Sequence, residues 1–307
     1  MDEKVFIGVS GWSYPDWAGV VYPERRPGRF SELACLAGYL DAVEINTSFY
    51  RPPAARMAAR WVEQASANPR FLFTAKLWQR FTHERNEPWT AAEARQVKDG
   101  MQPLREAGKL AALLLQFPWS FPATGANTDW LGRLAEEFRE FPCVVEVRHA
   151  SWDTDEARKL LTSSSLNFCN IDQPHSRSSI GMTNIATGPV AYYRFHGRNA
   201  HAWYSKDAGR DERYNYLYTE RELAPWVENI RDMAERAQQI FVMNNNHYQG
   251  QAVVNALQIK ASLSGRRVPA PESLIERYPV LRAIAAPPRG QGNLPFRNPR
   301  SKIPNPK

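Results

Sequence analysis

A short apolar run near the middle of the chain carries three side chains that can titrate or bind charge. Val144–Trp152 reads VVEVRHASW, a strand-forming sequence that contains Glu146, Arg148 and His149. Charged groups are costly to bury unless they are paired or used. Because side chains alternate across a strand, Glu146 and Arg148 share one face. Taken alone, this run could hold a buried ion pair or mark a strand end that emerges into water.

Six other strand-like runs end in polar residues in the same way, and only the first run of the chain does not. The polar residues at these ends are Glu44 and Asn46, Thr74 and Lys76, Gln116, Asn170 and Asp172, Arg194 and His196, and the run Asn244–His247. Alternation places the paired residues of each run on one face. Such groups are hard to explain as core packing, because a core would have to satisfy every one of them. We therefore predict a polar pocket assembled from seven strand ends.

The residue types indicate acid–base chemistry on an anionic or hydroxyl-rich ligand. The predicted catalytic residues are Glu146, Glu44, Asp172 and His196, and the predicted substrate-binding residues are Asn46, Tyr50, Lys76, Gln116, Arg148, His149, Arg194, Asn245 and His247. Glu146 and Glu44 would act as acid and base, since paired carboxylates with arginine partners suit glycosyl chemistry and proton transfer. Arginine forks suit carboxylate or phosphate groups. A loop rich in aromatic residues, Gly197–Thr219, would cover the site.

Three other interpretations remain open. Glu44, Glu146, Asp172, His196 and His247 could together bind Zn²⁺ or Mn²⁺, although no local ligand spacing such as HExxH occurs and the cofactor stays unknown. The protein could bind or process nucleic acid, with aromatic side chains stacking on bases and cations meeting phosphates. It could also be a barrel that binds a ligand without turning it over.

The elements that must position these residues alternate between strands and helices. Expected strands are Val5–Ser10, Ala42–Asn46, Phe71–Lys76, Ala111–Gln116, Cys143–Val147, Leu166–Asp172, Val190–Phe195 and Ile240–Asn244. Expected helices are Phe30–Leu40, Ala54–Ala67, Thr90–Ala107, Asp129–Glu140, Thr154–Ser163, Arg221–Gln238 and Gly250–Leu263. This order predicts a single (β/α)₈ TIM barrel over residues 1–286, with active groups at the carboxyl ends of the strands. The segment Gln173–Pro189 lacks helical periodicity and is predicted to be irregular. An open doubly wound sheet is the alternative fold, but no GxGxxG or GxxxxGK[ST] motif is present.

Charge and cysteine content restrict the partners and the compartment. The formal net charge is +7, but the proline-rich tail Pro287–Lys307 holds five basic residues and no acid, which leaves +2 for residues 1–286. This tail is expected to be disordered or draped on the surface, and the balanced body does not favour a broad nucleic-acid surface. Three cysteines and no secretory signal favour a cytoplasmic protein with free thiols. No run is apolar for long enough to span a membrane. The oligomeric state is not indicated.

The chain resembles the YecE-like family, the bacterial and archaeal proteins catalogued as domain of unknown function 72. The matching stretches are Gly8–Trp12, Val43–Tyr50, Phe71–His83, Leu113–Phe121, Val144–Trp152, Tyr192–Arg198 and Asn244–Ala256. The resemblance implies a TIM barrel and no settled reaction. From the residues themselves we expect an enzyme of hydrolase or lyase type that acts on a carbohydrate-like or phosphorylated ligand.

Overall fold

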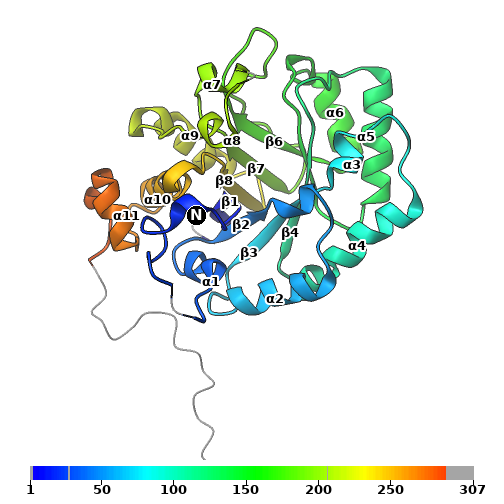
Figure 1. Cartoon of the computed structure of the whole chain (residues 1–307). Coiled ribbons are helices and arrows are strands. Elements are labelled where there is room, and N and C mark those ends of the chain that lie inside the picture. Colours follow the sequence, from blue (N-terminus) through cyan, green and yellow to red (C-terminus); the bar gives the residue numbers. More distant parts are fainter. Residues whose placement is uncertain (1–2, 27, 206, 288–307) are drawn as a thin grey trace, which may run out of the picture.

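Eight parallel strands close into one barrel in the computed structural model, which describes residues 3–26, 28–205 and 207–287 (Figure 1). The strands are β1 (Val5–Ser10), β2 (Ala42–Ile45), β3 (Leu72–Lys76), β4 (Leu110–Gln116), β5 (Cys143–Glu146), β6 (Asn167–Asp172), β7 (Val190–Phe195) and β8 (Gln239–Asn244). Each strand pairs with its neighbour in the chain, and β8 pairs with β1. The predicted (β/α)₈ barrel is confirmed.

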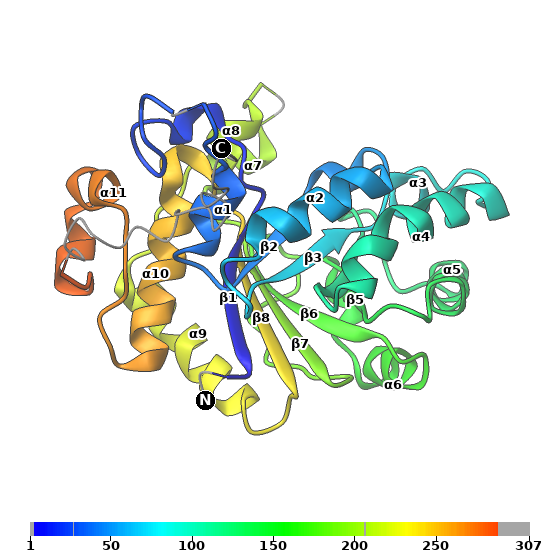
Figure 2. The ribbon, with the colours of Figure 1, turned by 90° about the horizontal axis from the view of Figure 1, so that it is seen from below.

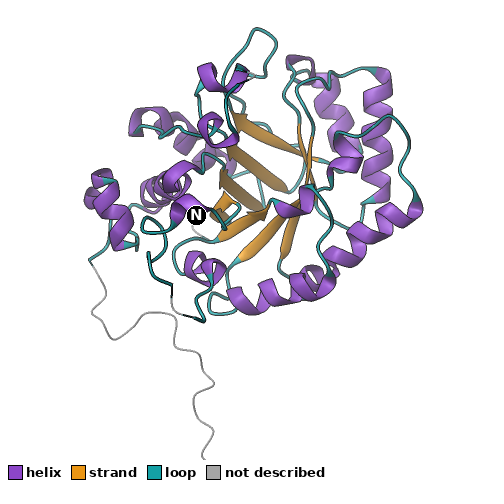
Figure 3. Ribbon diagram, in the orientation of Figure 1, coloured by secondary structure: helices purple, strands orange, loops and turns teal. Residues whose placement is uncertain are grey.

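Helices surround the barrel on its outside (Figure 3). They are α1 (Glu32–Ala37), α2 (Ala55–Ala65), α3 (Gln79–Thr82), α4 (Ala91–Glu106), α5 (Gly125–Glu137), α6 (Asp155–Ser163), α7 (Ala200–Tyr204), α8 (Arg210–Arg213), α9 (Glu220–Met233), α10 (Gln251–Ser264) and α11 (Glu272–Arg277). Side chains cap the starts of two of these helices. Thr90 and Glu93 form a capping box at the start of α4, and Thr154 accepts a hydrogen bond from the backbone of Ala157 at the start of α6.

Two segments are predicted to be free of helices, and the structure agrees with only one of these predictions. No helix lies between β6 and β7 in the described chain, as expected for Gln173–Pro189. The segment Gly197–Thr219, predicted to be a loop, contains the short helices α7 and α8, each of five residues or fewer. Helices this short have too few turns to produce a clear periodicity in the sequence. The predicted basic tail lies outside the described residues apart from Pro287.

The barrel interior is apolar at one end and polar at the other. Phe6, Ala42, Val144 and Phe241 belong to the inner apolar cluster, where the rings of Phe6 and Phe241 stack with centroids 5.1 Å apart. At Gly8, a Cβ atom would lie 2.1 Å from the carbonyl oxygen of Ala42, so only glycine permits this close pairing of β1 and β2. Beyond this layer, towards the carboxyl ends of the strands, the inward-facing side chains become polar.

The carboxyl ends of the strands open into a mouth built by several connecting segments. In Figure 2 the short helices α7 and α8 lie beside the segment that follows β1, at the same end of the barrel. Active sites of TIM barrels lie at this end. Among the described residues, no helix combines the length and the apolar character that a membrane crossing would need.

Candidate functional site

A buried arginine occupies the centre of the polar layer. Arg194, at the end of β7, donates a hydrogen bond from Nη2 to Oε1 of Glu44 at 2.7 Å and another from Nη1 to Oε2 of Glu146. All three side chains are completely buried. Arg148, which follows β5, donates from Nε and Nη2 to the other oxygen of Glu146 at 3.0 and 2.7 Å. We call these four residues the buried ion-pair network.

Neutral polar groups add further hydrogen bonds to this network, while Nε of Arg194 is buried without a partner among the described residues. The Glu44 carboxylate accepts from the hydroxyl of Tyr192 at 2.9 Å, and that hydroxyl also lies 2.8 Å from the hydroxyl of Thr74. Arg194 reaches Oε1 of Gln116 at 3.5 Å and Oγ of Ser10 at 3.4 Å. Ser10 was missed by sequence reasoning, because a single serine at the end of β1 gave no pattern. The first strand therefore also supplies a polar group to the interior.

The charges fix the protonation of two members of the polar layer. Burial alone would raise the pKa of Glu146, but the positive charges of Arg194 and Arg148 hold that pKa well below its usual value. Burial lowers the pKa of His196 to about 3. The neutral ring has its Nδ1 3.0 Å from the amide nitrogen of Asn245, and its Nε2 lies 3.3 Å from both Nη1 of Arg194 and Oε1 of Glu146. Glu146 is therefore a poor proton donor at neutral pH.

Lys76 is a third cation beside two carboxylates that are already paired. Glu44 binds Arg194, and Glu146 binds both Arg194 and Arg148, whereas Lys76 forms no ion pair with any described carboxylate. Burial and the charge of Arg194 lower the pKa of Lys76 to about 8. Two guanidinium groups balance the two carboxylates, so the proton on Lys76 is the least stabilised charge in this part of the protein.

Lys76 faces a pocket of about 350 Å³, which we call the mouth pocket. Its lining comes from the segments after β1, β2 and β8, from α2, from the end of β3 and from the segment before α9: Gly11, Trp12, Ser13, Tyr14, Asn46, Thr47, Phe49, Tyr50, Trp61, Lys76, Tyr214, Asn245 and His247. Four of the predicted ligand-binding residues besides Lys76 therefore meet here: Asn46, Tyr50, Asn245 and His247.

Aromatic rings and amides give the mouth pocket its chemical character. The rings of Tyr14 and His247 stack with centroids 4.4 Å apart, and Tyr214 lies 5.1 Å from His247. Oδ1 of Asn46 is buried and has no hydrogen-bond partner among the described residues. Asn46 lines the pocket, so this unsatisfied acceptor lies close to the space that a ligand would occupy. Tyr14 and Tyr214 were not predicted, since isolated tyrosines in connecting segments carry no spacing signal.

A smaller pocket of about 220 Å³ lies on the opposite side of the mouth. It contains Arg148, whose guanidinium lies 5.5 Å from the ring of Trp203, together with Gln173 and Trp119. Nε2 of Gln173 is buried without a partner in the described structure. Arg148 thus joins the buried network to a second polar recess.

Two predicted site residues, Asp172 and His149, lie outside the polar layer and both pockets. The expectation that β6 contributes Asn170 and Asp172 to the shared interior is wrong. Cys169 belongs to the inner apolar cluster, so the alternation of β6 turns its neighbours outward. Asp172 accepts a hydrogen bond from Nε1 of Trp226 in α9 at 2.7 Å and pairs with Arg198. It fastens the outer helix layer to β6.

His149 and Asn170 have structural partners. His149 accepts a hydrogen bond from the backbone of Ser151 and caps a short 3₁₀ helix, and it lines neither pocket of the mouth. Asn170 donates to the carbonyl oxygen of Ile185 at 3.0 Å and accepts from its backbone nitrogen at 2.8 Å, which ties down the helix-free connection after β6.

The five residues considered as metal ligands do not converge. Glu44 and Glu146 are separated by the guanidinium of Arg194, and Asp172 faces the helices. Over residues 3–26, 28–205 and 207–287, no group of three or more histidine, cysteine, aspartate or glutamate side chains is arranged to hold a metal ion.

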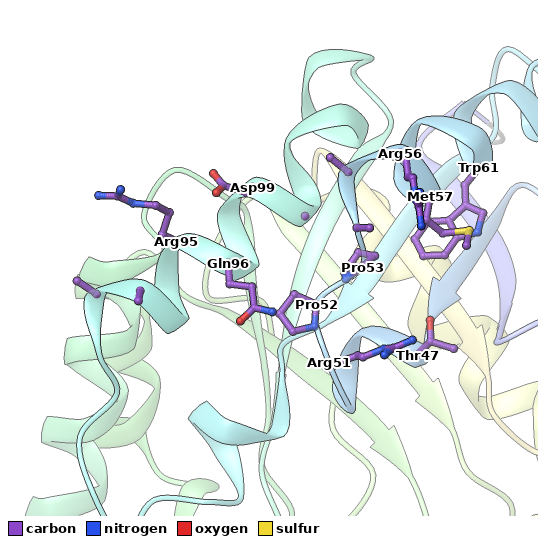
Figure 4. A pocket seen from close by; sticks show the side chains of 15 residues that line it. Thr47, Arg51, Pro52, Pro53, Arg56, Met57, Trp61, Arg95, Gln96 and Asp99 are labelled. Carbon is purple, nitrogen blue, oxygen red and sulfur yellow. The ribbon is translucent and has the colours of Figure 1, made fainter.

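A larger groove of about 1080 Å³ opens beside the mouth pocket and shares Thr47 and Trp61 with it. Figure 4 shows Arg56, Met57 and Trp61 on α2 to one side, Arg95 and Asp99 on α4 to the other, and the segment with Arg51 between them. No described carboxylate forms an ion pair with any of the three arginines that line this α2–α4 groove.

The family model described as "Protein of unknown function DUF72" matches residues 6–276. The chain belongs to the DUF72 family. The resemblance to YecE-like proteins is thereby confirmed, since this is the same family.

Relatives in the DUF72 family are similar along most of their length. UPF0759 protein YunF of Bacillus subtilis (strain 168) is 28% identical over 268 residues, which cover 83% of this chain and 93% of that protein. A DUF72 family crystal structure from Thermotoga maritima MSB8 is 33% identical, with a TM-score of 0.74 and coverage of 85% and 99% of the two chains. One from Enterococcus faecalis V583 is 26% identical, with a TM-score of 0.75 and coverage of 85% and 95%. The printed names of these relatives specify no reaction.

Proposed function

We propose that this DUF72 protein is an enzyme that binds a small, hydroxyl-rich, anionic molecule in the mouth pocket. One observation carries the proposal: the unpaired cation Lys76 lies in a pocket whose other walls are aromatic rings and amides. An anion placed there would supply the counter-charge that the buried carboxylates do not. A volume of about 350 Å³ suits a molecule of small-metabolite size.

The lining favours a sugar-like ligand. Aromatic faces such as those of Trp12, Tyr14 and Tyr214 pack against the apolar faces of sugar rings. Asn46 and Asn245 offer amide groups to hydroxyls, and the open acceptor on Asn46 adds a hydrogen bond that the protein itself does not make. A phosphate or carboxylate group on the same molecule would meet Lys76.

The reaction we propose is of hydrolase or lyase type, with proton transfer at the mouth rather than inside the buried network. Glu44 and Glu146 have completely buried side chains whose oxygens are engaged by arginines and Tyr192. Their role is to hold Arg194 and Arg148 in place. Lys76, with a pKa of about 8, exchanges its proton readily near neutral pH and faces the ligand. A cytoplasmic location is part of the proposal, since Cys35, Cys143 and Cys169 are buried free thiols.

The α2–α4 groove supports a second candidate, a longer polyanion such as single-stranded nucleic acid. Arg51, Arg56 and Arg95 would meet successive phosphates, while the end of the strand enters the mouth pocket. This candidate predicts a steep loss of binding with salt, whereas a small monoanion predicts a shallow one.

The test is a binding screen by calorimetry with sugar phosphates and uronic acids, on the wild type and on Lys76→Met. Loss of a charge-assisted hydrogen bond should weaken binding by about tenfold or more. Lys159→Met is the matched control, because Lys159 is exposed on α6 away from the mouth. Equal affinity of Lys76→Met and wild type for every ligand that binds would exclude the proposed site. Tight binding without turnover would instead favour a ligand-binding barrel.

A further inference from the structure

Lys76 has the surroundings of a nucleophilic amine as well as those of an anion-binding cation. Its Nζ lies 5.6 Å from the centre of the Phe49 ring and faces the mouth pocket. The cations Arg194 and Arg148 lie on the side of the buried network, and both carboxylates of that network are already bound to them. An amine beside an apolar ring and other cations, without its own carboxylate, loses its proton more easily than an exposed lysine.

The remaining charged and titratable neighbours act on Lys76 in both directions, and their net effect lowers its pKa. Glu44 and Glu146 favour the charged amine, but burial and Arg194 outweigh them, so the pKa of Lys76 falls to about 8. Burial, with the charges of Arg148 and Lys76, lowers the pKa of nearby His83 to about 4, which leaves that ring neutral. At pH 7 about one Lys76 side chain in ten is therefore an uncharged amine, far more than for an ordinary lysine.

We propose that Nζ of Lys76 forms a covalent imine with an aldehyde or ketone group of a small anionic ligand. This inference rests on the proposed function, because it takes the mouth pocket as the ligand site. It adds a substrate class, a carbonyl compound with hydroxyl groups and an anionic group, and it gives Lys76 the role of a catalytic residue.

The chemistry balances with no co-reactant. The Nζ lone pair forms a bond to the carbonyl carbon, and the C=O π pair moves to oxygen, which takes a proton. The carbinolamine hydroxyl takes up a proton from solvent, equivalent to the one that the ammonium group released, and leaves as water while the nitrogen lone pair completes C=N and nitrogen keeps its hydrogen. The protonated imine carries the positive charge previously held by the ammonium group. It draws electrons from a neighbouring C–H or C–C bond when that bond breaks, and water later releases the product and the free amine.

The pocket supplies the other groups that such a step needs. Asn46 and Asn245 share the lining of the mouth pocket with Lys76, and their amide groups can hydrogen-bond the carbonyl oxygen and adjacent hydroxyls. Oδ1 of Asn46 has no partner in the described chain, so this acceptor can bind the hydroxyl of the carbinolamine. The buried ion-pair network keeps its hydrogen bonds during imine formation, since its charges affect Lys76 but its side chains do not react.

The experiment is reductive trapping. The whole protein is incubated with pyruvate, glyceraldehyde 3-phosphate or glucuronate in the presence of cyanoborohydride, and modified lysines are located by peptide mass spectrometry. For at least one probe we expect at least about tenfold more adduct at Lys76 than at exposed lysines such as Lys159, since the neutral fraction is larger. The ratio of adduct at Lys76 to adduct at Lys159 should be largest below pH 8 and should fall as the pH rises towards 10, because Lys76 loses its proton first.

One control variant and one comparison within the wild type separate the outcomes. Lys76→Arg keeps the charge and should lose the adduct at position 76 while still binding the anionic probes in calorimetry. Probes that bind in a Lys76-dependent manner but are trapped no faster at Lys76 than at Lys159 overturn the imine and leave the proposed function standing. Absence of both binding and trapping overturns both. Because the decisive comparison is made within the wild-type protein, it does not depend on the folding of any variant.

Discussion

The buried ion-pair network and the mouth pocket are built from the same strand ends but use charge in opposite ways. In the network, the carboxylates of Glu44 and Glu146 are paired with the guanidinium groups of Arg194 and Arg148, and three of the four side chains are completely buried. In the pocket, Lys76 and Asn46 keep a charge and an acceptor that no described group satisfies. The difference separates residues that maintain the site from residues that meet a ligand.

The strongest test of this difference between network and pocket is to remove the guanidinium group of Arg194. Arg194→Met should reduce the free energy of unfolding by about 3–5 kcal/mol, because it leaves two buried carboxylates without a cation between them. Urea denaturation measures this. Arg148→Met is the control, since Arg148 is partly exposed and its loss leaves Glu146 still bound to Arg194, so the cost should be clearly smaller. A cost below about 1 kcal/mol for Arg194→Met would show that the network does not stabilise the barrel.

The pH dependence of stability tests the network through His196. Its pKa is lowered to about 3 in the folded protein, so the folded state resists protonation that the unfolded chain accepts. Stability should fall as the pH drops from about 6.5 towards 3. His196 contributes at most about 1.4 kcal/mol per pH unit to this slope, and His83, whose pKa is lowered to about 4, adds a similar contribution. The lowered pKa of Glu146 adds a further loss of stability at acidic pH, because its carboxylate takes up a proton more readily in the unfolded chain than in the folded protein. In His196→Gln the slope between pH 6 and 4.5 should be shallower than in the wild type, and identical slopes would contradict the buried neutral ring.

Lys76 should show the opposite behaviour to Arg194. Lys76→Met should keep or slightly raise the free energy of unfolding at pH 7, within about 1 kcal/mol, while anion binding falls by about tenfold or more. The sign follows from the lowered pKa: the folded protein holds the Lys76 proton less tightly than the unfolded chain, so the contribution of Lys76 to stability rises between pH 8 and 10.5, against the loss caused there by the raised thiol pKa values of Cys35, Cys143 and Cys169. That rise should disappear in the variant. A large loss of stability in Lys76→Met at pH 7 would show that Lys76 maintains the site rather than meeting a ligand.

The α2–α4 groove should give the smallest effect. Arg51→Gln and Arg95→Gln should each weaken binding of a polyanion such as heparin or oligodeoxynucleotide by about two- to threefold, as expected for exposed charges, and reduce its salt dependence. Small anions should bind these variants as they bind the wild type. If a monoanionic sugar phosphate lost affinity equally, the groove and the mouth pocket would have to be one site.

Sequence reasoning predicted the barrel because buried parallel strands and amphipathic helices leave strong periodic signals. It also brought Glu44, Glu146, Arg148 and Arg194 to one interior, since alternation within a strand is reliable. It failed for Asp172, because β6 reads NFCNID and offers polar residues on both faces. Which face turns inward depends on the pairing of Cys169 with Tyr192, a tertiary contact.

The sequence could not predict which polar residues belong to the network and which to the pocket, because this too depends on tertiary contacts. Lys76 and Arg194 are both basic residues near strand ends, and only the spatial pairing shows that one is neutralised by two carboxylates and the other is not. Short connecting segments supply Tyr14 and Tyr214 to the pocket, and their spacing in the chain carries no trace of their meeting.

The most direct test of the central claim is the titration of Lys76 by NMR of isotope-labelled lysine, assigned with Lys76→Arg. The claim is that Lys76 is the unsatisfied cation of the mouth pocket. It predicts a pKa of about 8 in the free protein and an increase of that pKa when inorganic phosphate is added, because a bound anion favours the charged amine. A pKa near the ordinary lysine value of about 10.4 that does not respond to phosphate would contradict it.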